Sequence, residues 1–350
     1  MQQAAIILLC LAASGFAQLN RSQPRQAPLA NTVKITPLGS HAGEFCRNDR
    51  ALLFEDPTGV RVLYDPGRTI AGGTDLRLGD VHVVILSHAH TDHVGDVKHN
   101  PASPGTCGNP GTVSAAPNTN LADIVAAKNS AFFAGGEMAD YFTRKIQNIR
   151  GAATPGCPAA GLTNEVVVPM SAPCTATLRP GGSRTVRMAS ATAGVKFAVV
   201  QAIHSNGINA ALIDDPSEAP GTAGYGGTEG GFIVKFTNGL TVYLTGDTGL
   251  FGDMNTIVRK YYKARVMVVN MSDTATLGPD EAAFATQQLV RPRTVIPEHI
   301  NEAATTGGVP TGQRMNRFLD QMSSSGIAVV LPLSGVTREF DGAGECLNCP

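Results

Sequence analysis

The chain has 350 residues, of which 43% are hydrophobic and 16% are charged. This length and balance are typical of a globular protein with a full hydrophobic core, in one large domain or two modest ones, and they exclude a disordered chain. The formal net charge is −1, so the chain lacks the basic excess that binds nucleic acid. Aromatic residues make up only 5% and Trp is absent, which disfavours broad stacking surfaces for bases or sugars.

The N-terminus has the features of a signal peptide, which we place at residues 1–17. A short apolar run over 6–13 precedes Ser14-Gly15-Phe16-Ala17, whose small residues suit cleavage after Ala17. The run is short for a bilayer core of ~30 Å. No Lys or Arg precedes it, so a retained membrane anchor is the alternative. We expect a secreted or otherwise extracytoplasmic protein with no stable membrane insertion.

Six cysteines would remain after this cleavage, and an even number in an exported chain suggests disulfides. They are Cys46, Cys107, Cys157, Cys174, Cys346 and Cys349. Six cysteines allow 15 pairings, and the sequence does not choose among them. Cys346 and Cys349 have the spacing of a redox or zinc pair, but no second such pair accompanies them. We interpret residues 341–350 as a stapled tail.

The folded region, placed at 33–340, begins with short β-type runs. Strands are predicted over 33–35, 51–54, 60–64 and 81–86, the last as a strand buried on both faces. Helical spacing follows over 121–128 and 136–149. Residues 98–118 and 151–182 are rich in Pro, Gly, Asn and Ser, and each segment carries Cys, so we predict that both are loop insertions.

The second half repeats this order of strands and then strand–helix units. Strands are predicted over 195–200, 231–236, 240–244, 265–269, 293–297 and 326–331. Helices are predicted over 251–262, 279–290 and 310–322. The doubled order predicts an α/β protein in which two sheets lie face to face with helices outside, each half of the chain giving one sheet.

The segment directly after the buried strand carries the strongest chemical signal. In Ser87-His88-Ala89-His90-Thr91-Asp92-His93, four side chains able to bind a metal occur within six residues. On a turn from strand to helix, His88 and His90 can point the same way, while Asp92 and His93 turn toward a neighbouring position. Imidazole and carboxylate ligands suit zinc, iron or manganese. A surface histidine cluster without function is the weaker interpretation.

Three further candidates follow predicted strands in the second half. His204, Asp247 and His299 each come at a strand end. A single histidine at such a place is more often structural than a ligand. Three of them at the same edge favour convergence on a common site.

These pieces together resemble the metallo-β-lactamase superfamily of hydrolases. The resemblance covers roughly 33–335 and is closest to the branch of ascorbate-6-phosphate lactonase and related uncharacterised metal-dependent hydrolases. The matching segments include Ser87–Asp96, Leu244–Met254 and Val295–Ile300, in the family's order. The resemblance implies a four-layer αββα sandwich, the metallo-β-lactamase fold.

The resemblance also implies a role for each candidate. His88, His90 and His204 would bind one divalent metal, most simply zinc, with manganese or iron possible. Asp92, His93 and His299 would bind a second, and Asp247 would bridge both. Asp65 matches a carboxylate that orients a ligand histidine, although Asp65-Pro66-Gly67 could also be a simple turn. His41 corresponds to a histidine of the branch's first loop, but its spacing differs and leaves a contact with substrate open.

The resemblance implies a hydrolase that uses a metal-bridging hydroxide, with Asp92 and Asp247 as its catalytic carboxylates. The branch favours a lactone or ester-type carbonyl in a small-molecule substrate. Two alternatives remain open: a phosphodiesterase with the same centre, and a metal-stabilised binding protein without turnover. We expect the insertions 98–118 and 151–182 to be long loops near the metal mouth that are tied by cysteine pairs and shape substrate access.

Overall fold

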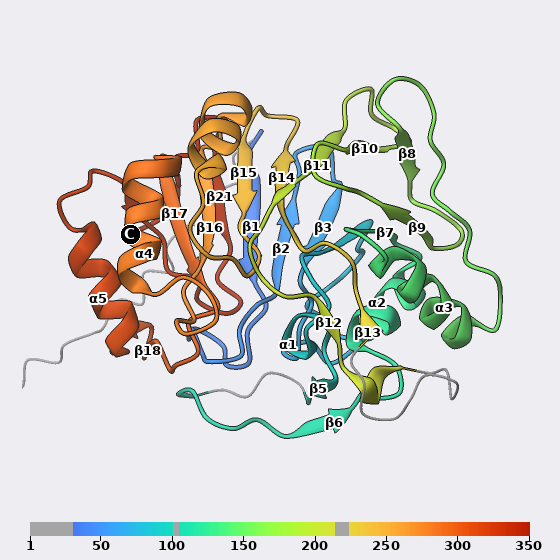
Figure 1. The fold of residues 1–350 in the computed structure, drawn as a ribbon, viewed down its shortest axis with the longest axis horizontal. Coiled ribbons are helices and arrows are strands. Elements are labelled where there is room, and N and C mark those ends of the chain that lie inside the picture. Colours follow the sequence, from blue (N-terminus) through green and yellow to red (C-terminus); the bar gives the residue numbers. More distant parts are fainter. Residues whose placement is uncertain (1–30, 101–104, 214–223) are drawn as a thin grey trace, which may run out of the picture.

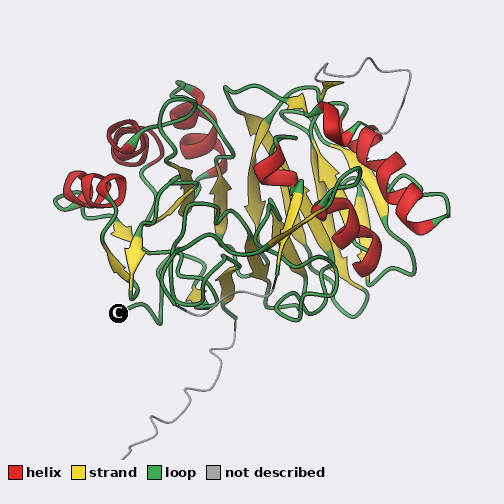
Figure 2. Ribbon diagram, turned by 90° about the horizontal axis from the view of Figure 1, so that it is seen from below, coloured by secondary structure: helices red, strands yellow, loops and turns green. Residues whose placement is uncertain are grey.

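The computed structural model describes residues 31–100, 105–213 and 224–350, so the predicted signal peptide lies outside the described residues. Two large β-sheets form the centre of the molecule (Figure 1). The strand order is β21-β1-β2-β3-β4-β7-β9 in the first sheet and β20-β17-β16-β15-β14-β11-β10-β8 in the second. Helices cover both outer flanks, and the strands lie between them (Figure 2).

The first sheet comprises β1 (Val33–Pro37), β2 (Leu52–Glu55), β3 (Arg61–Tyr64), β4 (Val83–Leu86), β7 (Ala131–Ala134), β9 (Cys174–Thr177) and β21 (Arg338–Phe340). The second comprises β8 (Glu165–Val168), β10 (Ser183–Met188), β11 (Val195–Gln201), β14 (Gly230–Lys235), β15 (Thr241–Leu244), β16 (Val266–Asn270), β17 (Thr294–Glu298) and β20 (Ala328–Val329). Three small ribbons pair β5 (Val97–His99) with β6 (Thr112–Ser114), β12 (Gly207–Ile208) with β13 (Gly224–Tyr225), and β18 (Thr305–Thr306) with β19 (Val309–Pro310).

The helices are α1 (Thr91–Val94), α2 (Asn120–Lys128), α3 (Met138–Arg150), η1 (Ala210–Leu212), η2 (Met254–Tyr262), α4 (Pro279–Phe284), η3 (Ala285–Val290) and α5 (Gln313–Met322). The helices predicted over 121–128, 136–149, 251–262, 279–290 and 310–322 are therefore confirmed to within a few residues. α4 and η3 together form the helix predicted over 279–290. Pro279 has no backbone N–H, and its absence costs nothing at the first position of a helix, where that N–H would have no partner within the helix.

Alternation of side chains along the strands produces the layers. In β11, Val195, Phe197 and Val199 face the core between the two sheets, whereas Ala198 and Val200 face the helices of the second half. A separate core lies between the first sheet and α2 and α3. Three apolar cores between four layers confirm the αββα sandwich expected from the sequence.

Strand direction places all the chemical candidates at one edge. β3 runs parallel to β4. In the second sheet β15, β16 and β17 are mutually parallel, and β11 has the same direction because β14 lies antiparallel between β11 and β15. The residues that follow these strands therefore emerge together at the end of the sandwich where α1 lies (Figure 1).

The division of one sheet per half of the chain holds with two exceptions. β21, near the C-terminus, pairs with β1 and so belongs to the first sheet. β8 precedes β9 in sequence, yet β8 joins β10 at the edge of the second sheet. The sequence pattern also missed β7, because four apolar residues between two helices are too few to show an alternation.

The prediction that residues 151–182 form a long loop is wrong. This segment contains β8 and β9, which extend the edges of both sheets. Each strand has only four residues and lies close to Pro or Gly residues, which made the segment resemble a loop. The structure is decided instead by backbone pairing, of β8 with β10 and of β9 with β7.

Three disulfides join the six cysteines: Cys46–Cys107, Cys157–Cys174 and Cys346–Cys349. The tail is thus closed on itself, as interpreted from its spacing. Among the described residues, no helix has both the length and the apolar character needed to cross a bilayer.

Candidate metal centre

The seven predicted ligands converge at the shared sheet edge. His88 follows β4, His90 precedes α1, and Asp92 and His93 lie on that short helix. The other three follow strands of the second sheet: His204 after β11, Asp247 after β15 and His299 after β17. Residues more than two hundred positions apart in sequence, such as Asp92 and His299, are in direct contact.

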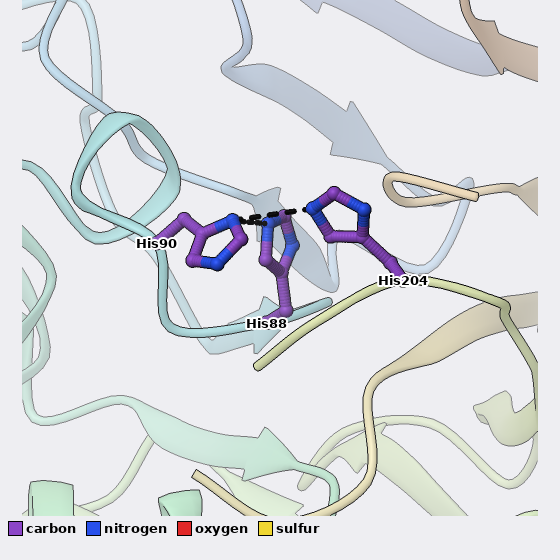
Figure 3. Close-up of side chains that lie close together, drawn as sticks. All are labelled: His88, His90 and His204. Atoms are coloured by element: carbon purple, nitrogen blue, oxygen red, sulfur yellow. Dashed lines mark hydrogen bonds between the residues drawn. The ribbon is translucent and has the colours of Figure 1, made fainter. Parts of the chain in front are cut away.

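His88, His90 and His204 form the first group, in which three imidazoles face one another (Figure 3). His90 Nδ1 lies 3.0 Å from His88 Nε2 and 3.2 Å from His204 Nε2. Burial lowers the pKa of His88 well below its ordinary value, and the neighbouring His93 lowers it further. His88 is therefore neutral at pH 7, and a neutral ring presents the lone pair that a metal ligand needs.

Asp92, His93 and His299 form the second group. His299 Nε2 lies 2.9 Å from Asp92 Oδ2, and His93 Nε2 lies 3.7 Å from the same oxygen. Burial would raise the pKa of Asp92, but His93, His299 and Arg50 outweigh burial and hold that pKa far below its ordinary value. Asp92 therefore stays ionised at neutral pH and gives the second group a carboxylate ligand.

Asp247 lies between the two groups and points one carboxylate oxygen at each. Its Oδ2 is 3.7 Å from His204 Nε2 and 3.9 Å from His88 Nε2. Its Oδ1 is 3.0 Å from His299 Nδ1 and 3.5 Å from His93 Nε2. This is the arrangement that a carboxylate bridging two cations requires.

The donors present fit a pair of divalent cations. His93 Nε2, Asp247 Oδ1 and His299 Nδ1 are buried, and none of them makes a hydrogen bond although they face one another. A buried polar atom without a partner is costly. Burial lowers the pKa of His93, but Asp247, Asp92 and Asp65 reverse the effect and raise it, so the carboxylates concentrate positive charge at this point. Imidazole and carboxylate donors are those of zinc, iron and manganese sites.

Comparison with known proteins shows the family of the chain. The family model described as Beta-lactamase superfamily domain matches residues 60–300. The chain belongs to the metallo-β-lactamase superfamily.

Relatives within the superfamily are metal-dependent hydrolases, and the similarity covers between about a third and nearly all of the chain. A UPF0173 metal-dependent hydrolase of Cupriavidus necator is 26% identical over 329 residues, covering 94% of this chain and 93% of the relative. A second, from Thermodesulfovibrio yellowstonii, is 41% identical over 105 residues, covering 30% of this chain and 36% of the relative. With the buried histidine and aspartate groups at the expected edge, the chain is a metal-dependent hydrolase.

Two solved structures share the fold of this hydrolase. The metallo hydrolase Igni18 of Ignicoccus hospitalis superposes with a TM-score of 0.54 at 23% identity, covering 89% of this chain and 99% of Igni18. YhfI of Bacillus subtilis, a metallo-beta-lactamase fold protein, superposes with a TM-score of 0.50 at 14% identity, covering 88% of this chain and 99% of YhfI.

Asp65 supports both groups from behind the centre. Its Oδ2 lies 2.7 Å from His93 Nδ1 and also accepts the Ser87 hydroxyl at 2.6 Å, while its Oδ1 accepts the Ser87 N–H at 2.8 Å. Ser87 Oγ in turn lies 3.0 Å from His88 Nδ1. One fully buried carboxylate thus fixes the ring orientation of a histidine in each group. Asp65 therefore does more than form the simple turn that the Asp-Pro-Gly sequence also allowed.

Sequence reasoning missed the other positioning residues of this hydrolase. Arg50 is buried, and its guanidinium donates to Asp92 Oδ2 and to Asn301 Oδ1. Glu229 Oε1 accepts the backbone N–H of His204. Neither residue belongs to a ligand motif, and only the folded chain brings Arg50 to Asp92, which lies 42 residues further along the sequence.

A pocket of about 440 Å³ opens over the centre. Five predicted ligands line it: His90, Asp92, His204, Asp247 and His299. Its remaining lining is polar or small and comes from loops after β1, β11, β16 and β17 and from the start of α5. His88 and His93 lie beneath the others, each about 1% exposed.

The two insertions relate to this pocket differently. Residues 98–118 carry Cys107, whose disulfide with Cys46 ties them to the loop bearing Arg47 at the pocket rim. None of the described lining residues comes from 98–118 or from 151–182, so neither insertion forms the wall of this pocket. His41, left open by the sequence, is buried against Ser40 and Cys46 and is not among the described lining residues.

Proposed function

We propose that this protein is a secreted dinuclear metal-dependent hydrolase that opens a lactone or cleaves an ester-type carbonyl in a small-molecule substrate. The observation that carries the proposal is the position of Asp247, with one carboxylate oxygen toward each group of ligands. Zinc is the metal we propose first, because histidine and aspartate are its usual ligands in hydrolytic sites.

His88, His90 and His204 would hold one metal, Asp92, His93 and His299 the other, and Asp247 both. Such metals, when bound, lower the pKa of water from 15.7 toward roughly 7 and polarise a carbonyl oxygen. This chemistry takes its nucleophile from water and needs no nucleophilic side chain.

Asp92 is the residue best placed to orient the attacking water. Its contacts with Arg50 and His299 all use Oδ2, and the side chain lines the pocket. Its strongly lowered pKa keeps it ionised at neutral pH. We assign Asp92 the task of orienting the attacking water by accepting a hydrogen bond from it, while Arg50 keeps the carboxylate in place.

Secretion is supported by the apolar N-terminal run and by the presence of three disulfides in the described residues. Expression of the full chain in a bacterial host tests it. The mature protein should appear outside the cytoplasm and begin at Gln18, and an uncleaved N-terminus on cytoplasmic protein would contradict the proposal.

A substrate panel tests the reaction class. The protein, loaded with two equivalents of Zn²⁺, is assayed against lactones, simple esters, β-lactams and aryl phosphodiesters. We expect turnover of lactones or esters above the rest. Turnover of phosphodiesters alone would move the protein to phosphodiester hydrolysis, and metal binding without any turnover would favour a metal-stabilised binding protein.

A further inference from the structure

The rim of the pocket suggests which substrate the centre receives. Two arginines line the pocket: Arg47, in the loop after β1, and Arg314, at the start of α5. Among the described residues, no large apolar side chain lines it. A pocket of about 440 Å³ is the size of a small-molecule site, but such sites are usually mostly apolar. This one suits a polar ligand.

Arg47 presents an unpaired positive charge on a fixed backbone. Its neighbour Cys46 is held by the disulfide to Cys107 and donates its N–H to Asp49 Oδ2 at 2.8 Å. The carbonyl oxygen of Arg47 accepts from Arg50 Nη1 at 3.0 Å. The side chain is exposed and has no carboxylate within ion-pair distance among the described residues. The loop is therefore rigid while the guanidinium stays available.

Arg314 is partly buried and incompletely satisfied. Its Nε is buried without a hydrogen-bond partner. The nearest carboxylate, Asp273 Oδ2, lies 4.0 Å away, which is too long for a hydrogen bond. A guanidinium prefers two parallel hydrogen bonds to a carboxylate or phosphate. Asp273 does not supply them in this arrangement.

The turn that carries Asp273 is held in a strained conformation at the pocket wall. Asp273 and Thr274 have φ of 66° and 59°, which is unusual for any residue with a Cβ and most unusual for a β-branched one such as Thr274. Both residues line the pocket. Such strain persists where the surrounding structure fixes it, often in a ligand site.

Asn301 adds a donor to the same rim. Its Oδ1 accepts from Arg50 Nη2 at 2.9 Å, which leaves the Nδ2 amide group to donate into the pocket. The side chains of Arg47, Arg314 and Asn301 thus all offer donors, and Asp273 is the one acidic rim residue among the described ones that is not a predicted metal ligand.

We propose that the substrate carries an anionic group, a carboxylate or a phosphate, away from the bond that is cleaved, and that Arg47 and Arg314 bind this group. The inference rests on the proposed hydrolase function and adds the substrate class. Asn301 Nδ2 donates to the polar body of the same molecule. The described lining residues offer no apolar surface to a long acyl chain.

Matched substrate pairs test the proposal on the Zn²⁺-loaded protein. One pair is a γ-lactone carboxylate and its methyl ester; the other is a phosphorylated hydroxymethyl lactone and its unphosphorylated form. We expect the anionic member to have the higher kcat/KM, by about tenfold or more, because hydrogen bonds to charged groups are the stronger ones. Whichever pair shows the larger preference identifies the anion as carboxylate or phosphate.

Substitutions attribute the preference to the two arginines. Arg47→Gln and Arg314→Gln should each raise KM for the anionic member about tenfold with little change in kcat, and leave the neutral member within about twofold. Asp273→Asn removes the negative charge beside Arg314 and should therefore lower KM for the anion several-fold. The turn should keep its shape, because Asn also tolerates positive φ. The matched control is Arg317→Gln on the same helix, because Arg317 pairs with Asp280 outside the pocket. Equal losses on both members of a pair would overturn the proposal.

A binding measurement separates this proposal from the proposed function. Calorimetric titration with inorganic phosphate and with acetate needs no turnover. It is applied to the metal-loaded wild type, to the double variant that combines Arg47→Gln with Arg314→Gln, and to Arg317→Gln. If no substrate is hydrolysed but the double variant alone binds these anions about tenfold more weakly, the function fails and the anion site stands. If lactones are hydrolysed but all three proteins bind both anions equally, the function stands and the anion site fails.

Discussion

The two groups of metal ligands differ in charge and in what holds them. The first group is three imidazoles, and His90 Nδ1 lies within 3.2 Å of both partners. The second contains Asp92, which is ionised and buttressed by Arg50. The first is thus assembled by ring packing, and the second by charge pairing.

Two carboxylates join these unlike groups into one unit. Asp247 faces both from the pocket side, and Asp65 contacts both from behind, directly through His93 and by way of Ser87 through His88. The difference teaches that a substitution can be aimed at one group or at both. The following predictions use that choice, from the largest expected effect to the smallest.

Asp247→Ala should remove both metals and lower activity by orders of magnitude. Each cation loses a ligand, and the two cations lose the anion that screens their repulsion. Metal content by elemental analysis and turnover on the best panel substrate measure the effect. Asp253→Ala, at the start of η2, is the control and should retain both metals.

A purely structural role for Asp247 gives a different outcome. If Asp247 only stabilised the fold, Asp247→Ala would cost ~0.5–3 kcal/mol of stability and leave metal content unchanged. Two equivalents of metal with near-normal turnover would refute the bridging role.

His204→Ala and His299→Ala should each release mainly one metal and still abolish most activity. His204 belongs to the imidazole group and His299 to the carboxylate group, so each variant should keep the other site. Elemental analysis should give about one equivalent for both. Loss of both metals from either variant would show that the groups do not bind independently at all.

Asp65→Asn should weaken both sites without removing a ligand. The neutral amide no longer stabilises the His93 ring and no longer holds the Ser87 hydroxyl that contacts His88. Loss of such an outer partner typically costs 10–100-fold in metal affinity. Competition with a chromophoric chelator measures both affinities, and a change confined to one equivalent would contradict the shared support.

Ser87→Ala and Arg50→Lys should produce the smallest effects, each on one group. Ser87→Ala removes the contact to His88 and should weaken the first site several-fold. Arg50→Lys keeps the charge but loses the fork that contacts Asp92 and Asn301, so it should weaken the second site. The same chelator titration resolves the two cases, and identical profiles for both variants would remove the distinction between the groups.

Much of the site could be predicted from the sequence because the ligands follow strands. A strand ending in His88-Ala89-His90-Thr91-Asp92-His93 fixes four side chains locally, and parallel strands bring His204, Asp247 and His299 to the same edge. The layers followed from the doubled order of strands and helices. These inferences use local periodicity and one rule of topology.

The remainder depends on contacts that leave no local pattern. Arg50 reaches Asp92 only through the packing of the loop after β1. β8 and β9 owe their strands to pairing with β10 and β7, against Pro and Gly flanks that predict a loop. β21 joins the first sheet through pairing with β1 across the whole chain, which no window of sequence shows.

The metal stoichiometry of the wild-type protein tests the central claim most directly. The chain is stripped with a chelator, equilibrated with Zn²⁺, freed of excess metal by gel filtration and analysed for zinc per chain. A centre built on Asp247 between two groups of ligands predicts two equivalents. One equivalent or none in folded protein would contradict it.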